Sequence, residues 1–367
     1  MRPNYADRLK YLRVKDDMKQ EDLAKALGFK SHQIVSNIEN GDRKISAAEI
    51  IRACEIFSVD MSFFTNPYLL VGEGDFSWRQ SGNDQDALVS FQEKAGELIG
   101  AYRVLKSQLN ETPQMIMPEI RLNSKTRVHE AVRAGEAIAE ELGLGEMPGT
   151  ALVDTAEEKL GAIVLQVDPK NGISGAACRL QDLNAVIINR NEPVGRRTFN
   201  LAHEIFHLLT WEAMPPETID NVDGPKSHVE KLADAFASGL LLPSKTVEKY
   251  AAYIDFGKQG CVDRLNSLAT EMKVSSVMLG YRLINTGYAN RDLFEEYKEA
   301  KFFSYNGDMV DRNDTPPLYS KKFLSVLSRG IHKGLISQLR VVNLLDMSLK
   351  DVKELYEKHK LESPFGI

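Results

Sequence analysis

The chain has 367 residues, more than one hydrophobic core ordinarily organises, which indicates two or three domains. Hydrophobic residues make up 43% and charged residues 27%, the average of soluble globular proteins, which excludes disordered and fibrous classes. The net charge of −6 excludes nucleic-acid binding through bulk charge, because even residues 1–70, with eleven Lys and Arg against ten Asp and Glu, carry only +1.

The sequence carries no signal for a membrane, for export or for disulfides. No run of eighteen apolar residues occurs, and the first ten residues, MRPNYADRLK, lack the apolar core of a signal peptide. We therefore expect a cytoplasmic protein without a membrane partner. Cys54, Cys178 and Cys261 are too widely spaced for a disulfide framework or a CxxC metal site and are interpreted as buried thiols.

Residues 1–70 show the apolar spacing of a small helical domain, with intervals of three and four. The segment Gln20–Ser46 predicts one helix that ends at Gly28, a tight turn, and a second helix over about 31–39 that stops at Gly41. A second helix of this kind fits the major groove of duplex DNA.

Short or amide-bearing side chains of the second helix are candidates for base contacts, and flanking residues are candidates for phosphate contacts. The base candidates are Ser31, His32, Gln33, Ser36 and Asn37, and the phosphate candidates are Gln20, Arg43 and Lys44. The expected partner is double-stranded operator DNA. Because so few positive charges are available, we also expect a homodimer.

The phrases QEDLAKALG and IENG resemble the XRE, or lambda-repressor-like, helix-turn-helix family over about sixty residues. The resemblance implies a DNA-binding domain that regulates transcription. The stretch from Gly28 to Gly41 is one residue longer than the commonest family spacing, which leaves the start of the second helix open. A helical bundle that serves protein contacts is the alternative interpretation.

Residues 71–125 are interpreted as a linker followed by one long helix. The stretch from Gly72 to Asp84 is polar and carries glycines. From Asp84 to Leu109, apolar residues recur close to a heptad and predict a helix that packs on its own domain. A dimer seam is the alternative, although only about three heptads are present.

Residues 126–300 form a region of mixed secondary structure. A helix is predicted over about 128–142. The runs AIVLQV (162–167) and AVIIN (185–189) are β-branched and bounded by Gly, Asp and Asn, so they predict strands, with a further strand in GISGAACRL between them. After Arg197 the pattern is helical again.

The segment RRTFNLAHEIFHLLT, residues 196–210, carries an HExxH motif. His203 and His207 are four residues apart on one helix face, so both imidazoles can reach one Zn²⁺ ion. Glu204 would then lie beside a water on that ion, where it can act as general base. Two buried, hydrogen-bonded histidines are the alternative interpretation.

A catalytic zinc ion needs a third protein ligand, for which residues 227–243 offer two candidates. Glu230 and Asp234 are four residues apart on a predicted helix, so Glu230 can bind the metal while Asp234 holds a histidine nitrogen. His228 competes as a ligand but cannot share the helix face of Glu230. We favour Glu230 because Asp234 completes the arrangement.

Residues 172–243, with GISGAA, AVIIN, the HExxH helix and ExxxDxFASGLLLP in that order, resemble the ImmA/IrrE metallopeptidase family. The resemblance implies that His203, His207 and Glu230 bind zinc and that Glu204 is the base. Asp234 stands where asparagine is more usual, which leaves its exact influence on the metal open.

The two resemblances support each other, because XRE units are often fused to or paired with ImmA/IrrE domains in prophage, mobile-element and stress-response regulators. The leading hypothesis is a transcriptional regulator with a zinc-dependent endopeptidase domain, which acts on a protein substrate or partner regulator in stress, prophage or toxin-antitoxin control. One alternative is a repressor or antitoxin whose peptidase domain is a non-catalytic sensor of a ligand or partner. The other is a protease whose helix-turn-helix recognises a protein substrate.

Residues 301–367 are interpreted as a helical C-terminal region for interaction or dimerisation, with two or three helices between Phe323 and Tyr356. A second DNA contact there is disfavoured because few basic residues line it. The predicted fold class is α+β and mainly helical, with an all-α N-terminal domain, a zincin-like domain with a small sheet, and this helical region.

Overall fold

A computed structural model of the chain describes residues 5–71, 74–81, 85–111, 118, 120–169, 172–216, 219–221, 224–254, 258–297 and 315–365. The fold is α+β and mainly helical, as predicted. None of the described helices combines the length and the apolar character needed to cross a membrane. The predicted helical region from residue 301 is described only from residue 315 onward.

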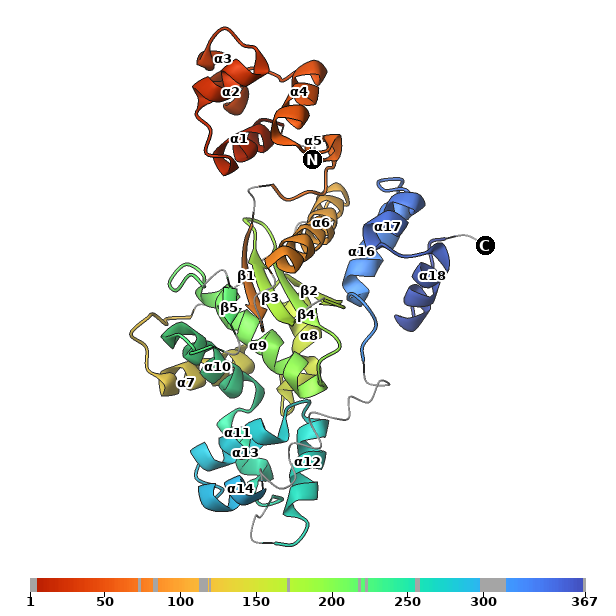
Figure 1. The fold of residues 1–367 in the computed structure, drawn as a ribbon. Coiled ribbons are helices and arrows are strands. Elements are labelled where there is room, and N and C mark those ends of the chain that lie inside the picture. The colour runs from red at the N-terminus through yellow and green to blue at the C-terminus, as the bar shows by residue number, and fades with distance from the viewer. Residues whose placement is uncertain are drawn as a thin grey trace.

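The N-terminal unit is a bundle of five short helices around its own core (Figure 1). These helices are α1 (Tyr5–Lys15), α2 (Gln20–Leu27), α3 (His32–Glu39), α4 (Ala47–Phe57) and α5 (Met61–Thr65). The core consists of eleven buried residues, among them Leu9, Leu23 and Phe64. The three-and-four spacing of the sequence therefore did identify the buried face of these helices.

The centre of the molecule is a five-stranded sheet with the order β2-β4-β3-β1-β5. Its strands are β1 (Asp75–Gln80), β2 (Ala162–Val167), β3 (Ile173–Arg179), β4 (Asn184–Asn189) and β5 (Ile219–Asn221). β3 runs antiparallel to both β1 and β4, whereas β2 pairs with β4 and β5 with β1 in parallel. The three strands predicted from β-branched runs are all present.

The interpretation of residues 72–84 as a linker was wrong for β1, which lies inside the sheet between β3 and β5. The strand alternates apolar and polar side chains, Phe76 and Trp78 against Ser77 and Arg79. Trp78 is fully buried. Apolar and polar side chains alternate along this six-residue strand, as is typical of strands, but the polar residues on both sides made the alternation hard to recognise.

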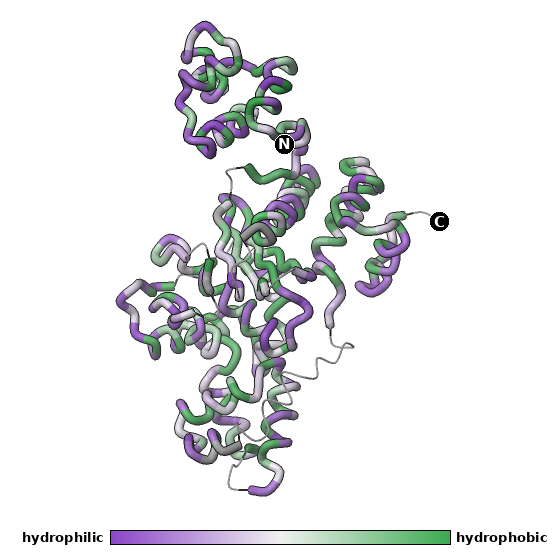
Figure 2. The backbone as a smooth tube through the Cα atoms, viewed as in Figure 1, coloured by the Kyte–Doolittle hydropathy of each residue, from purple (hydrophilic) through white to green (hydrophobic). Residues whose placement is uncertain are grey.

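The two faces of the sheet border different cores. Figure 2 shows hydrophobic stretches of the backbone at the centre of the molecule, mixed with hydrophilic ones. On β4, Val186 and Ile188 face one core, and Ala185 and Ile187 face the other. This alternation follows from the period of two along a strand. A sheet buried on both faces explains why β2 and β4 are almost uninterrupted apolar runs.

Helices cover each face. The first core includes residues of α7 (Val128–Glu141), α8 (Pro148–Glu158), α9 (Val194–Thr210), α10 (His228–Leu241), α11 (Ser244–Ala251), α12 (Cys261–Glu271), α13 (Ser276–Asn285) and α14 (Arg291–Tyr297). The second includes residues of α6 (Gln85–Gln108), α16 (Lys321–His332), α17 (Gln338–Leu345) and α18 (Leu349–Lys358). The long helix α6 thus packs within the chain, as favoured from the sequence.

Helices α7 and α10 approach each other unusually closely, and two glycines permit this. A Cβ atom at Gly135 would lie 2.2 Å from the Phe236 carbonyl oxygen, and one at Gly239 would lie 2.0 Å from the Val132 carbonyl oxygen. Both distances are far shorter than a van der Waals contact. The position of α10, which carries Glu230, is therefore set by backbone contact with α7.

The N-terminal unit joins the rest of the chain through a polar junction at Asn66. The Asn66 side chain donates to Glu97 of α6 at 2.9 Å, and Arg340 of α17 donates to the same carboxylate at 3.0 Å. The Arg340 guanidinium also lies over the Tyr68 ring, 5.5 Å from its centroid. Two helices of the second core therefore contact the end of the N-terminal unit.

Candidate nucleic-acid interface and metal centre

Helices α2 and α3 form the predicted helix-turn-helix. Helix α2 ends at Leu27, and Gly28 follows in the left-handed conformation with φ of 77°, which a residue with a side chain rarely adopts. Ser31 begins the next helix as its cap, because its hydroxyl accepts a hydrogen bond from the Gln33 backbone N–H. The structure therefore places the start of α3 at His32, the point that the sequence spacing left open.

The base candidates lie on and beside the outer face of α3. Ser31, His32 and Gln33 are exposed, whereas Ser36 and Asn37 are half-buried. The Gln33 side-chain amide donates to Oδ1 of the Asn37 side chain at 3.1 Å. This hydrogen bond holds two amide groups side by side at the surface, where both have donors and acceptors left for base edges.

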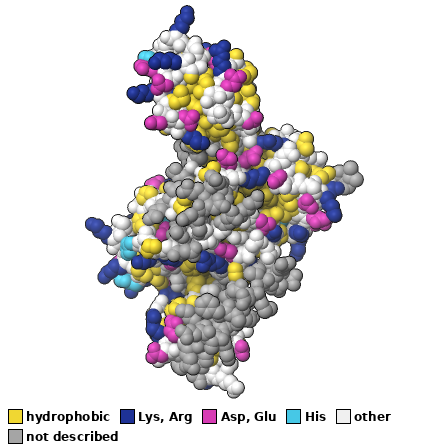
Figure 3. Space-filling model, viewed as in Figure 1, with side chains coloured by type: hydrophobic (Ala, Val, Ile, Leu, Met, Phe, Trp, Pro, Cys, Tyr) yellow, Lys and Arg dark blue, Asp and Glu magenta, His cyan; other side chains and the backbone are white. Residues whose placement is uncertain are grey.

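Two of the phosphate candidates are engaged within the chain. Gln20 donates to the Glu39 carboxylate at 2.8 Å, and Arg43 pairs with Glu49 at 2.7 Å. Lys44 is exposed. Figure 3 shows Lys and Arg side chains around the outer end of this unit, interleaved with Asp and Glu. Contact of Gln20 or Arg43 with a phosphate therefore requires exchange of an internal partner.

The buried Glu39 carboxylate ties three helices of this unit together. Arg13 of α1 binds both of its oxygens, at 2.6 and 3.0 Å, and Gln20 of α2 binds one of them. The hydrogen bond that Arg13 donates to Glu39 raises the pKa of Arg13 against the opposing effect of burial. The network fixes α3 at its C-terminal end.

The second candidate site lies between α9 and α10 on the first core. His203, His207 and Glu230 are each at most 3% exposed, and their ligand atoms lie within 4.8 Å of one another. His203 Nε2 is 2.9 Å from Glu230 Oε2 and 3.1 Å from His207 Nε2. The structure therefore brings together the three residues that the sequence predicted as ligands.

The donor set fits a metal ion. His203 Nδ1 lies 3.0 Å from Asp234 Oδ1, which fixes the proton on Nδ1 and turns the lone pair of Nε2 toward Glu230. The 2.9 Å separation of Nε2 from the Glu230 oxygen then needs a shared positive charge, either a proton or a metal ion. No Lys or Arg of the described chain pairs with Glu230, and His207 Nδ1 has no hydrogen-bond partner there. A cation bound by the three residues would relieve this arrangement.

His228, the competing ligand candidate, points elsewhere. Its Nε2 atom lies 2.8 Å from the Thr126 carbonyl oxygen, at the start of the segment that leads into α7. The preference for Glu230 over His228 as the residue near both imidazoles agrees with this placement, because residues two apart on a helix face different directions.

Glu204 is also buried, at 2% exposure, on the side of α9 that faces β3. A Cβ atom at Gly175 of β3 would lie 3.7 Å from Glu204 Oε1. The missing side chain at Gly175 leaves room beside this carboxylate. The base candidate thus lies on the same helix as both imidazoles and next to the sheet.

Asp234 is held by more partners than the sequence indicated. Besides His203, it pairs with Lys226 and lies 3.7 Å from Nη2 of Arg79. Burial raises the pKa of Asp234, whereas His203 and Lys226 lower it, to about 2 in total. Burial likewise raises the pKa of Glu230, but contacts with His203 and His207 outweigh burial and hold this pKa well below its usual range. Both carboxylates are therefore charged at neutral pH.

Sequence reasoning missed Arg79 and Asn200. Arg79 lies on β1, more than a hundred residues before the motif, and donates to Asn200 Oδ1 at 3.0 Å. Asn200 in turn donates to Glu192 at 2.6 Å. Burial raises the pKa of Glu192, while hydrogen bonds and nearby arginines oppose that rise. The alternation of apolar and polar residues in β1 was the one sequence signal that could have placed Arg79 opposite the helix.

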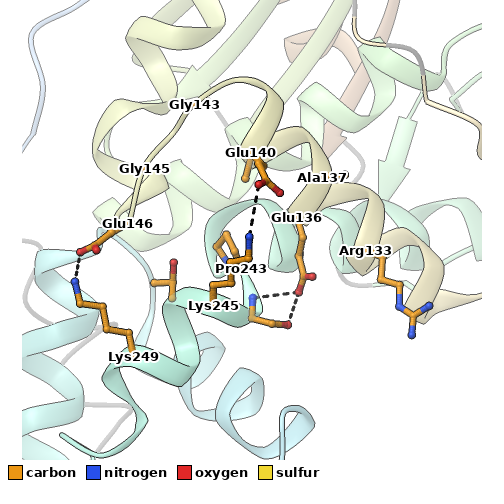
Figure 4. Close-up of a pocket in the computed structure, with 13 residues that line it drawn as sticks. Arg133, Glu136, Ala137, Glu140, Gly143, Gly145, Glu146, Pro243, Lys245 and Lys249 are labelled. Carbon is orange, nitrogen blue, oxygen red and sulfur yellow. Dashed lines mark hydrogen bonds and ion pairs between the residues drawn. The ribbon is translucent and has the colours of Figure 1, made fainter.

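A large surface cavity of about 750 Å³ lies away from this cluster, between α7 and the start of α11 (Figure 4). Its charged residues neutralise one another: Lys245 pairs with Glu140 at 3.5 Å, and Lys249 pairs with Glu146. A third acid, Glu136, accepts from the Ser244 backbone and hydroxyl. We assign no activity to this cavity.

Comparison with known families agrees with both sites. Residues 9–64 match the sequence model of the helix-turn-helix family, and residues 158–284 match that of the IrrE N-terminal-like domain. No curated protein and no solved structure matches the chain. The first match spans α2 and α3, and the second spans α9 and α10. The chain therefore joins an XRE-type helix-turn-helix region to an IrrE/ImmA-like, peptidase-like region.

Proposed function

We propose that the chain is a DNA-binding transcriptional regulator whose peptidase-like region is a zinc-dependent endopeptidase. The observation that carries the proposal is the buried convergence of His203, His207 and Glu230, with a further buried carboxylate, Glu204, on the same helix as the two imidazoles. Ionisable groups that converge inside a protein core are costly to keep there. Such an arrangement is typical of functional sites.

His203 and His207 would hold the zinc ion through their Nε2 atoms, and Glu230 would hold it through its carboxylate. When bound, zinc supplies Lewis-acid chemistry, which lowers the pKa of a water and polarises a peptide carbonyl. Asp234 keeps the proton of His203 on Nδ1. Glu204 accepts the proton of the attacking water and delivers it to the leaving amine.

The helix-turn-helix region would place α3 in the major groove of an operator. Gln33 and Asn37 would contact base edges, while Arg43 and Lys44 would contact phosphates after Arg43 leaves Glu49. Two copies of the chain on two half-sites would supply the affinity that one small unit of low charge lacks. Cleavage of a partner regulator would then link a stress, prophage or toxin-antitoxin signal to transcription.

Glu204→Gln tests the proposed chemistry. The variant should retain the zinc content of the wild type, because Glu204 is not in the ligand set, and should lose about 10²–10⁴-fold in peptide cleavage. Substrates are sought by comparing new protein N-termini in cells that express wild type or variant. Glu212→Gln, an exposed residue paired with Arg179, is the matched control and should cleave normally.

Two results would overturn the proposal. Cleavage that persists in Glu204→Gln would remove the base. A wild-type chain that takes up no zinc would leave a non-catalytic region that senses a ligand or partner, and the DNA-binding regulator would remain.

A further inference from the structure

Arg79 is a buried cation on β1, an interior strand of the sheet. Its side chain is only 3% exposed, and it lies on β1 between two residues with apolar or amide side chains, Trp78 and Gln80. A guanidinium is seldom buried without charged or hydrogen-bonded partners. The partners of the Arg79 guanidinium therefore indicate the role of this side chain.

The guanidinium contacts both helices that carry the ligand set. Nη1 donates to Asn200 Oδ1 of α9 at 3.0 Å, and Nη2 lies 3.7 Å from Asp234 Oδ1 of α10. The group also lies 5.7 Å from the centroid of the Phe199 ring, and that ring is 6.3 Å from the His203 ring. Asn200 and Phe199 thus fix the guanidinium from α9 while its other nitrogen faces α10.

The oxygen that Arg79 faces is the oxygen that holds the first histidine. Asp234 Oδ1 lies 3.0 Å from His203 Nδ1, whereas Lys226 binds the other oxygen, Oδ2. Two cations on opposite oxygens leave the carboxylate little freedom to rotate. Rotation would break the contact with His203 and release the imidazole from its orientation toward Glu230.

We propose that Arg79 is a positioning residue for the metal centre, which holds the Asp234 carboxylate against His203 Nδ1 and spans α9 and α10 through the two nitrogens of its planar fork. The inference rests on the proposed zinc site. It gives strand β1, which follows the helix-turn-helix unit in the sequence, a part in metal binding beside those of α9 and α10.

Arg79→Lys is the sharpest test, because lysine keeps the buried charge but cannot reach Asn200 and Asp234 at once. Zinc affinity is measured by competition with a chelator on the full-length chain, after circular dichroism has confirmed folding. We expect about tenfold weaker binding, within the ~10–100-fold range for loss of an outer partner of a metal ligand. Arg179→Lys on the neighbouring strand β3, which breaks only the pair with Glu212, should bind zinc as the wild type does.

A double-mutant cycle separates positioning from general damage. Asp234→Ala alone should weaken zinc binding, and Arg79→Lys added to it should cause no further loss, because Arg79 acts through Asp234. Unchanged affinity in Arg79→Lys, or losses that multiply in the double variant, would overturn the assignment. If Arg79→Lys does not fold, Asn200→Ala, which removes the anchor of Nη1, is measured with the same expectation.

A measurement on the metal-free chain distinguishes this inference from the proposed function. With ¹⁵N-labelled histidine, Nδ1 of His203 should give the signal of a protonated nitrogen in the wild type and an averaged signal in Arg79→Lys. If the wild type binds no zinc, the proposed peptidase fails, yet the His203 signal still decides the role of Arg79. An identical signal in both chains would overturn that role.

Discussion

The two functional regions place their polar side chains in opposite surroundings. In the helix-turn-helix unit, the candidate contacts Gln33 and Lys44 are exposed, and the buried network around Glu39 only fixes the helix behind them. In the peptidase-like region, His203, Glu204 and Glu230 are themselves buried. For Gln33 and Lys44, the first region separates recognition from structural support, whereas the proposed function of the second region gives both tasks to the same buried residues.

This difference determines what a substitution measures. At an exposed position, a change alters binding and leaves the folded state almost unchanged. At a buried polar position, a substitution leaves the neighbouring groups without their hydrogen-bond partner, so stability and function change together. The predictions below test whether the two regions really differ in this way, from the largest expected effect to the smallest.

Removal of a buried ligand should have the largest effect. Glu230→Ala is expected to lower zinc affinity by more than the ~10–100-fold that an outer partner costs, because a ligand itself is lost. Elemental analysis of the purified chain, wild type beside variant, measures this directly. Lys231→Ala, the exposed neighbour on α10, serves as control. Equal zinc in Glu230→Ala and wild type would show that the buried cluster is not the metal site.

Arg13 and the buried Glu39 form an ion pair inside the helix-turn-helix unit, and breaking it should resemble damage to the second region. Glu39→Ala leaves the Arg13 charge without its partner and should destabilise the unit by about 3 kcal/mol. Hydrogen exchange over residues 9–64 reports the loss, with exposed Glu55→Ala as control. If protection stays at the wild-type level, Glu39 does not fix α3.

The close approach of α7 and α10 offers a test of purely structural support for the buried site. In Gly239→Ala, the new methyl group meets the Val132 carbonyl, so α10 must move outward. We expect a loss of about 1–3 kcal/mol in unfolding free energy, together with weaker zinc binding. Chemical denaturation and chelator competition measure the two effects. Loss of stability at full zinc affinity would mean that α10 shifts without disturbing Glu230.

A change on the exposed face of α3 should have the smallest effect on stability. Gln33→Ala is expected to alter unfolding free energy by less than about 0.5 kcal/mol, while affinity for the chain's own promoter falls by about 1–3 kcal/mol. Fluorescence anisotropy with promoter DNA measures the affinity. Combining it with Arg43→Ala should weaken binding further, through a phosphate contact. Promoter binding at wild-type strength in the double variant would contradict the assignment of α3.

Local spacing was sufficient to predict in outline which candidate residues lie together. A helix that ends at Gly28 and a second helix from about residue 31 agree with α2 and α3, and residues four apart placed His203 with His207 and Glu230 with Asp234. These relations depend on the geometry of one helix, which the sequence contains in full. The helix period also showed that Glu230 and His228 cannot share one helix face, and the spacing of Asp234 from Glu230 decided the preference for Glu230.

Relations between distant segments were not predictable in the same way. Nothing near Gln20 or Arg43 shows that Glu39 and Glu49 bind them, because those contacts depend on how the helices pack. Arg79 reaches Asp234 only because β1 pairs with β3 almost a hundred residues later. Such pairing is set by the whole sheet, and a short strand between polar segments gives a weak local signal.

The location of β1 limits how this protein can be divided or recombined. The strand follows the DNA-binding unit within a few residues, yet it is hydrogen-bonded on both sides, to β3 and to β5. A fragment that begins at residue 126 would lack an interior strand and the Arg79 side chain, and it would expose the edges of its two neighbours. DNA-binding modules should therefore be exchanged at a point before β1. A gene fusion made after α6 would carry a strand of the peptidase-like region's sheet with it.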